Sequence, residues 1–213
     1  MTMNSNGADI LNFTYFDVFR FPFPTSLTLK KVAVISHWHR DHLPVPSDVA
    51  DFILLTPPGS NDIGPWFYEG KVTTIMQLPY DPVTMCDGRR FTLLPGCHAY
   101  YWLISWKNSA FLYVGDLNYG EVENVARIVS KLISSGRQLT VILPIYGGIK
   151  DLAARRIHRI PDSLPITALA EEVEKFAVKL KSVNIRVFGV PHPLQTADWA
   201  EEVAVRALRP LIY

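Results

Sequence analysis

Cysteine is nearly absent from this sequence, which has only Cys86 and Cys97 in 213 residues. Two cysteines are too few for a disulfide framework, and this agrees with a reducing compartment. The sequence also lacks an apolar run of membrane-spanning length, and residues 1–9 are polar rather than a basic segment followed by an apolar one. We therefore expect a cytoplasmic protein without a membrane partner.

An excess of charge of either sign is missing as well. The 21 lysines and arginines nearly balance the 20 aspartates and glutamates, which leaves a net charge of +1. No global field draws such a protein to nucleic acid, so any binding of that kind must come from a local patch. Hydrophobic residues make up 48% and charged residues 19%, which excludes a disordered chain. The length suits one domain with a sizeable core, and we expect a single domain over residues 1–213.

The order of the apolar segments predicts an α/β fold. Short strands separated by turn signals come first, and we expect them at residues 32–35, 52–55, 72–78, 91–94, 100–106 and 111–114. Further along, helices expected at residues 122–133, 168–180 and 198–208 alternate with strands at 139–143 and 186–190. This pattern is typical of a layered α/β domain with sheets inside and helices outside.

Four metal-capable side chains follow the first of these strands within six residues: His37, His39, Asp41 and His42. On a continued strand, His37 and His39 would point to the same face and could reach one metal ion. Asp41 and His42 lie further along, where the chain can turn and serve a second ion. Nitrogen and oxygen ligands of this kind suit zinc, and also manganese or iron. The segment therefore predicts metal chemistry.

Three more candidate ligands occupy strand ends. His98 lies between two predicted strands, Asp116 follows Gly115 after another, and His192 lies between Pro191 and Pro193 after the last. Taken singly, each could be an ordinary half-buried histidine or a turn aspartate. Together with residues 37–42 they favour one metal centre. Of the six histidines, only His158 has no position at the end of a predicted strand.

The combination of these motifs resembles the metallo-β-lactamase superfamily. The resemblance covers nearly the whole chain and implies a four-layer αβ/βα sandwich with two metal ions at one edge of its two sheets. It implies that the first ion is held by His37, His39 and His98. It implies that the second is held by Asp41, His42 and His192, with Asp116 bridging the two.

The N-terminal half also resembles the DNA cross-link repair nucleases of the Artemis group. The matching residues are the segment 16–20, the 37–42 motif, residues 93–98 and residues 112–116. The resemblance implies that Asp17 orients the metal ligands. Those nucleases carry an inserted β-CASP domain before the last histidine, whereas only 75 residues separate Asp116 from His192 here. The chain therefore resembles the compact hydrolases of the superfamily.

The implied activity is hydrolysis by a hydroxide bound to two divalent ions, with zinc expected and manganese or iron as alternatives. Metal ions lower the pKa of bound water from about 15.7 towards 7, which supplies a nucleophile without a serine or cysteine. Asp41 would bind metal and orient the hydroxide. Tyr146, after a predicted strand, is a candidate proton donor, although a packed loop aromatic is an alternative interpretation.

A basic run in the long loop expected between residues 148 and 165 indicates the substrate. Its Arg155, Arg156 and Arg159 could bind phosphate oxygens, since guanidinium groups match them in geometry. We therefore expect a phosphodiester substrate, either a small molecule or a nucleic acid. A solvated basic loop is the alternative for these arginines. Two other functions stay open, namely hydrolysis of a small ester, lactone or thioester, and metal binding without turnover.

Overall fold

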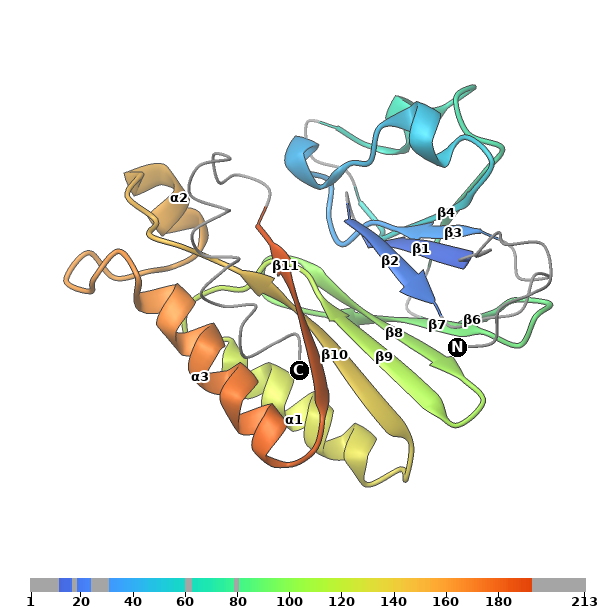
Figure 1. Ribbon diagram of the computed structural model, residues 1–213. Helices are drawn as coiled ribbons and strands as arrows, with labels where there is room; N and C mark the ends of the chain where they lie inside the picture. The colour runs from blue at the N-terminus through green and yellow to red at the C-terminus, as the bar shows by residue number, and fades with distance from the viewer. Residues whose placement is uncertain (1–11, 17–18, 24–30, 60–62, 79–80, 193–213) are drawn as a thin grey trace, which may run out of the picture. The chain divides into compact units, whose positions relative to one another are not determined.

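The computed structural model describes residues 12–16, 19–23, 31–59, 63–78 and 81–192 (Figure 1). The chain divides into two compact units, which we call unit 1 (Met1–Gln77) and unit 2 (Leu78–Tyr213). Asp17 and the helix predicted at residues 198–208 lie outside the described residues. Among the described residues, no helix combines the length and the apolarity needed to cross a membrane.

Unit 1 is built on a five-stranded sheet in the order β2-β1-β3-β4-β5. Its strands are β1 (Asn12–Phe16), β2 (Phe19–Phe23), β3 (Val32–Val34), β4 (Ile53–Thr56) and β5 (Thr74–Gln77). Only β1 and β2 pair in antiparallel fashion, while the β1–β3, β3–β4 and β4–β5 pairs are parallel. β3 is central and fully buried, in agreement with its unbroken apolar sequence.

The described part of unit 1 also contains three short 3-10 helices: η1 (Arg40–His42), η2 (Pro46–Val49) and η3 (Pro65–Tyr68). Buried side chains of the sheet and of these connections, among them Ile35, Trp38 and Tyr68, form one apolar cluster. The expected strand continuation through residues 37–39 was wrong, because β3 ends at Val34 and the chain bends before it enters η1.

Unit 2 is built on a six-stranded sheet in the order β11-β10-β9-β8-β7-β6. Its strands are β6 (Val83–Thr84), β7 (Arg90–Pro95), β8 (Tyr100–Trp106), β9 (Ser109–Val114), β10 (Gln138–Ile145) and β11 (Arg186–Pro191). The strands from β6 to β9 form an antiparallel meander, whereas β9, β10 and β11 are parallel. β10 is buried throughout from Leu139, as its apolar sequence predicts for an inner strand.

Two amphipathic helices pack on the parallel end of this sheet, α1 (Val122–Ile133) and α3 (Ala168–Ser182) (Figure 1). The apolar face of α1 buries Val122, Val125 and Val129, and that of α3 buries residues such as Leu169 and Phe176. These faces join β9, β10 and β11 in the larger apolar cluster of the molecule. Each unit thus has its own core, and the predicted α/β class is confirmed.

The segment between residues 148 and 165, expected to be a long loop, contains the short helix α2 (Leu152–Ile157). Asp151 caps its first turn, since the Asp151 carboxylate accepts a hydrogen bond of 2.8 Å from the Ala154 backbone N–H. The basic sequence of this helix lacks a clear apolar face, which explains why periodicity did not reveal it.

Candidate metal centre

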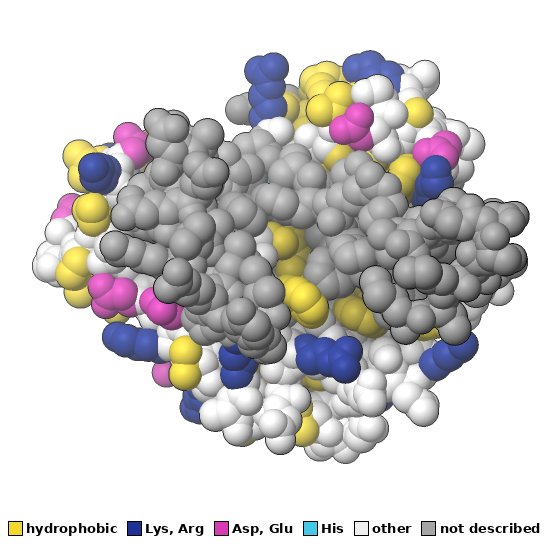
Figure 2. Space-filling model, in the orientation of Figure 1, with side chains coloured by type: hydrophobic (Ala, Val, Ile, Leu, Met, Phe, Trp, Pro, Cys, Tyr) yellow, Lys and Arg dark blue, Asp and Glu magenta, His cyan; other side chains and the backbone are white. Residues whose placement is uncertain are grey.

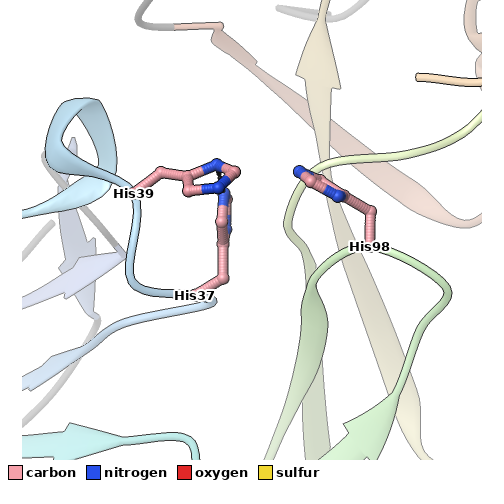
Figure 3. Close-up of side chains that lie close together, drawn as sticks. All are labelled: His37, His39 and His98. Carbon is pink, nitrogen blue, oxygen red and sulfur yellow. Dashed lines mark hydrogen bonds between the residues drawn. The ribbon is translucent and has the colours of Figure 1, made fainter. Parts of the chain in front are cut away.

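Two histidines of unit 1, His39 and His42, lie close to His37 in the segment that follows β3. The His37 Nε2 lies 3.0 Å from the His39 Nδ1, a hydrogen bond shown as a dashed line in Figure 3. The ring centroids of His37 and His42 are 4.2 Å apart. The turn itself brings these rings together, because the His42 backbone N–H donates to the His39 carbonyl at 3.0 Å. A bend rather than a continued strand thus places the His37 and His39 rings next to each other.

A serine orients the central ring of this group. The Ser36 Oγ lies 2.9 Å from the His37 Nδ1, and both side chains are buried. A hydrogen bond on one ring nitrogen fixes the orientation of an imidazole and selects the nitrogen that meets a metal, as partners of metal-binding histidines do. Asp41 lies in η1, in the same segment, and its side chain is outside what the structure describes.

In unit 2, Asp116 lies between two histidines that come from distant parts of the chain. It follows β9 and is 3% exposed. Its Oδ1 is 2.9 Å from the His192 Nε2, and its Oδ2 is 3.8 Å from the His98 Nε2. His98 stands in the turn between β7 and β8 (Figure 3), and His192 directly follows β11. Each oxygen of the Asp116 carboxylate thus lies nearest to a different histidine.

A fourth residue of unit 2, His158, joins this group, although its sequence position gave no such indication. It follows α2 and is 2% exposed. One ligand atom each from Asp116, His158 and His192 lie within 4.8 Å of one another. The His158 ring centroid is 5.6 Å from that of His192 and 5.9 Å from that of His98. We call His98, Asp116, His158 and His192 the Asp116 cluster.

The donor atoms of the Asp116 cluster fit a divalent metal ion. Ligand atoms that share one ion at about 2.0–2.2 Å lie roughly 3–4 Å apart, so the observed spacing requires only small side-chain movements. Imidazole nitrogen with carboxylate oxygen is the mixture of ligands that zinc, manganese and iron accept. The described residues therefore include histidine and aspartate groups that can hold metal.

Glu121, at the start of α1, holds the two segments that carry His98 and Asp116. Its Oε1 accepts a hydrogen bond of 2.6 Å from the Cys97 backbone N–H, and its Oε2 accepts one of 2.9 Å from Asn118. Because Cys97 directly precedes His98 and Asn118 closely follows Asp116, this single buried carboxylate fixes both ligand positions.

Two neighbours strengthen that arrangement. The Tyr101 hydroxyl also donates to the Glu121 Oε1, and burial followed by this hydrogen bond raises the pKa of Tyr101 above its ordinary value. Gly96 permits the tight turn before His98, since a Cβ at this position would collide with the Ala99 carbonyl oxygen and the Tyr101 ring. Sequence reasoning missed Glu121, and the signal available was an acidic residue at the start of a predicted helix.

Tyr146 packs against the histidines of the Asp116 cluster. It is 2% exposed, and its hydroxyl oxygen accepts a hydrogen bond of 2.7 Å from the Leu117 backbone N–H. Its ring stacks on that of His192, with centroids 5.1 Å apart and planes at 29°. Burial, followed by the nearby Asp116 carboxylate, raises the pKa of the Tyr146 hydroxyl well above its ordinary value. The hydroxyl therefore keeps its proton at neutral pH.

The three arginines expected to bind substrate differ in their surroundings. Arg155 is 4% exposed, and its guanidinium donates to the carbonyls of Pro161 at 2.6 Å and Leu164 at 2.9 Å. This side chain holds the backbone after α2 in place, so the expected role of Arg155 in substrate binding needs correction. Arg156 and Arg159 are exposed and lie on either side of His158 in the sequence.

No protein-family model and no curated protein sequence matches this chain. Several solved structures resemble it, and two are described here. One is a mutant of the β-hydroxylase CmlA, with 15% identity, a TM-score of 0.48, and coverage of 87% of this chain and 42% of the other. The second is the metallo-β-lactamase fold protein YhfI from Bacillus subtilis, with 13% identity, a TM-score of 0.44, and coverage of 83% of this chain and 71% of the other. This chain thus spans less than half the length of the first structure. At these levels of identity and TM-score, both likenesses concern the fold alone.

Proposed function

We propose that this chain is a metal-dependent hydrolase that cleaves phosphodiesters. The observation that carries the proposal is the placement of Asp116, which presents one oxygen to His192 at 2.9 Å and the other to His98 at 3.8 Å. By the resemblance, Asp116, His98 and His192 would be the residues of unit 2 that hold the two ions. The other expected ligands belong to unit 1, namely His37, His39, Asp41 and His42.

A pair of divalent ions would supply a hydroxide nucleophile near neutral pH and polarise the bond that it attacks. The residues of the chain would do the rest. Asp116 and the histidines would fix the positions of the charges, and Asp41 would orient the nucleophile. Ser36 and Glu121 would keep the ligands in place, through the hydrogen bond to His37 and through the backbone next to His98 and Asp116.

The preference for a phosphodiester rests on two exposed arginines, one in the last turn of α2 and one just after it. Arg156 and Arg159 flank His158 in the sequence, and exposed guanidinium groups bind phosphate oxygens in pairs. Tyr146 is the proposed proton donor to the leaving oxygen, because its hydroxyl is protonated at neutral pH and its ring stacks on His192.

The test is hydrolysis of bis-p-nitrophenyl phosphate, beside a simple lactone and p-nitrophenyl acetate, by protein reconstituted with Zn²⁺ or Mn²⁺ after chelation. We expect phosphodiester cleavage that disappears on chelation. We also expect kcat/KM to fall at least about 100-fold in Asp116→Asn and in His39→Ala. The control is Asp51→Asn, which removes an exposed carboxylate paired only at the surface with Lys31 at 2.6 Å.

Turnover of the lactone or the acetate alone would overturn the phosphodiester assignment and leave a hydrolase of small esters. Stoichiometric metal without turnover of any of the three substrates would contradict hydrolysis and favour a metal-binding protein.

A further inference from the structure

We propose that His158 is an additional metal ligand, on the side of Asp116 where His192 lies. This proposal rests on the proposed metal dependence, but the ligand set implied by the superfamily resemblance is complete without His158. The starting observation is that His158, Asp116 and His192 each place a ligand atom within 4.8 Å of the other two. All three residues are at least 96% buried.

The backbone holds His158 firmly beside Asp116. The His158 carbonyl accepts a hydrogen bond of 2.8 Å from the Tyr119 backbone N–H, and its own N–H donates to the Ala154 carbonyl at 3.0 Å. The first of these bonds joins the end of α2 to the segment that directly follows Asp116. The short distance between the two side chains is therefore a consequence of the main-chain structure rather than of one rotamer.

The His158 side chain is also oriented as a ligand should be. Its Nδ1 lies 2.9 Å from the Leu117 carbonyl oxygen. A carbonyl only accepts, so the Nδ1 carries the hydrogen and the Nε2 of the neutral ring carries the lone pair. Metal-binding histidines characteristically donate the other ring N–H to a carbonyl or carboxylate, which fixes the tautomer and the ring orientation. His158 meets this condition through the residue next to Asp116.

A buried structural histidine is the competing explanation, and the surroundings argue against it. The rings nearest to His158 are His192 at 5.6 Å, His98 at 5.9 Å and Tyr146 at 5.3 Å between centroids. The group that is costly to bury here is the Asp116 carboxylate, whose charge a cation would balance. Ring nitrogens from several histidines around one carboxylate are also the donors that a divalent cation takes as ligands.

His158→Asn separates the two explanations. An asparagine amide can still donate to the Leu117 carbonyl in place of the Nδ1–H, but it has no atom at the position of the Nε2. The control is Asp151→Ala, which removes the cap of α2 and costs about 1 kcal/mol of stability without removing any ligand atom.

The measurements are the Zn²⁺ dissociation constant by competition with a chromophoric chelator, the metal content after dialysis, and the visible spectrum of Co²⁺-loaded protein. We expect His158→Asn to weaken the binding of one ion by at least about 10-fold and to change the Co²⁺ spectrum, while Asp151→Ala matches the wild type.

Unchanged affinity, metal content and Co²⁺ spectrum in His158→Asn would overturn the proposal and leave His158 a structural residue, even if the wild type hydrolyses phosphodiesters. The opposite result is also informative. If His158→Asn binds metal more weakly but the metal-loaded wild type shows no turnover, His158 is supported as a metal ligand and the proposed hydrolase activity is overturned. A wild type that binds neither Zn²⁺ nor Co²⁺ would overturn both.

Discussion

At the scale of single residues, Glu121 is the side chain whose removal should reveal most about how the ligands of unit 2 are held. Glu121→Gln replaces one acceptor oxygen by an NH₂ group, which faces either the Cys97 or the Asn118 backbone N–H and cannot accept from it. One backbone N–H then loses its partner, so we expect a loss of about 1–3 kcal/mol in the free energy of unfolding, measured by urea denaturation.

The matched control is Glu123→Gln, which makes the same chemical change at an exposed position of α1. It should alter the free energy of unfolding by no more than about 0.5 kcal/mol. Equal effects of the two substitutions would show that Glu121 does not hold these segments.

Tyr146 combines a structural role with a proposed catalytic one, and a single substitution can distinguish them. In Tyr146→Phe the Leu117 backbone N–H loses its acceptor, which should cost about 1–3 kcal/mol of stability. If the hydroxyl also protonates the leaving oxygen, kcat falls about 10²–10⁴-fold for a methyl phosphodiester substrate but little for a p-nitrophenyl one, because p-nitrophenolate leaves without protonation.

Tyr68→Phe is the control for that experiment, since it removes a buried hydroxyl that donates to the Pro44 carbonyl at 2.8 Å in unit 1. It should lower stability without any dependence on the leaving group. The same kcat ratio for the two substrates in Tyr146→Phe and in the wild type would leave Tyr146 a packing residue.

Two errors at this scale have one physical cause. His158 was passed over because it follows no predicted strand, yet hydrogen bonds to residues 117 and 119 bring it to Asp116 from 42 positions away. Arg155 was expected to face substrate, yet its guanidinium donates to Pro161 and Leu164. In both cases the partners are backbone groups of nearby turns, and the residue types of a sequence do not indicate where such groups point.

At the scale of secondary-structure elements, the C-terminal end of α2 and the residues after it contain one buried arginine, Arg155, and two exposed ones, Arg156 and Arg159. Arg155→Lys keeps the charge, but it replaces a guanidinium whose Nη2 donates to the Pro161 and Leu164 carbonyls and whose Nη1 donates to the Ile149 carbonyl at 3.5 Å. A single ammonium nitrogen cannot occupy both positions, so we expect about 1–3 kcal/mol less stability in thermal unfolding. Arg156→Ala combined with Arg159→Asn should leave stability nearly unchanged, because both side chains are exposed. Asparagine is chosen at position 159 because the φ of Arg159 is 53°.

In the activity assay the same two variants should behave in the opposite way. The Arg156 and Arg159 double variant should raise KM for bis-p-nitrophenyl phosphate about 10-fold or more, while Arg155→Lys changes KM little. An unchanged KM in the double variant would identify these arginines as solvated surface.

Most elements could be predicted from the sequence, for reasons that differ by type. The strand at residues 100–106 and the helix at 122–133 match β8 and α1, because a bounded apolar run or an apolar face with period 3.6 leaves few alternatives. The short helix α2 was missed because its main contribution to the core is the buried Arg155 rather than an apolar stripe. The bend at residues 36–38 could not be foreseen, since the partner of the Ser36 hydroxyl is the side chain of the neighbouring His37.

At the scale of the whole molecule, each unit has its own apolar core, and the expected metal ligands are divided between the two units. A ligand that binds only the folded chain stabilises it by about 2.7 kcal/mol at a concentration 100 times its dissociation constant. Chelation should therefore lower the melting temperature by roughly 5–10 °C for a chain of this size, measured by scanning calorimetry. An identical melting temperature with and without chelator, for protein shown to contain metal, would contradict a folded-state metal site.

Charge on this scale gives little guidance to substrates. The net charge is +1, and on the face shown in Figure 2 the lysines and arginines are scattered, with acidic side chains among them. Long-range attraction of an anionic polymer is therefore weak, and selection of a phosphodiester must come from a few contacts such as those of Arg156 and Arg159.

The parallel pairing of β10 with β11 also affects the order in which parts of the chain can fold. Between Ile145 and Arg186 lie 40 residues, including α2 and α3, and His192 is fixed when its backbone N–H reaches the Ile145 carbonyl at 2.9 Å. Pairing across such a separation forms slowly, because the chain must close a long loop first. Asp116 and His98 belong to the earlier meander and can be in place before His192 arrives. We therefore expect the Asp116 cluster to be completed after the meander has formed, so that an ion captured there would mark a chain in which β11 has docked on β10.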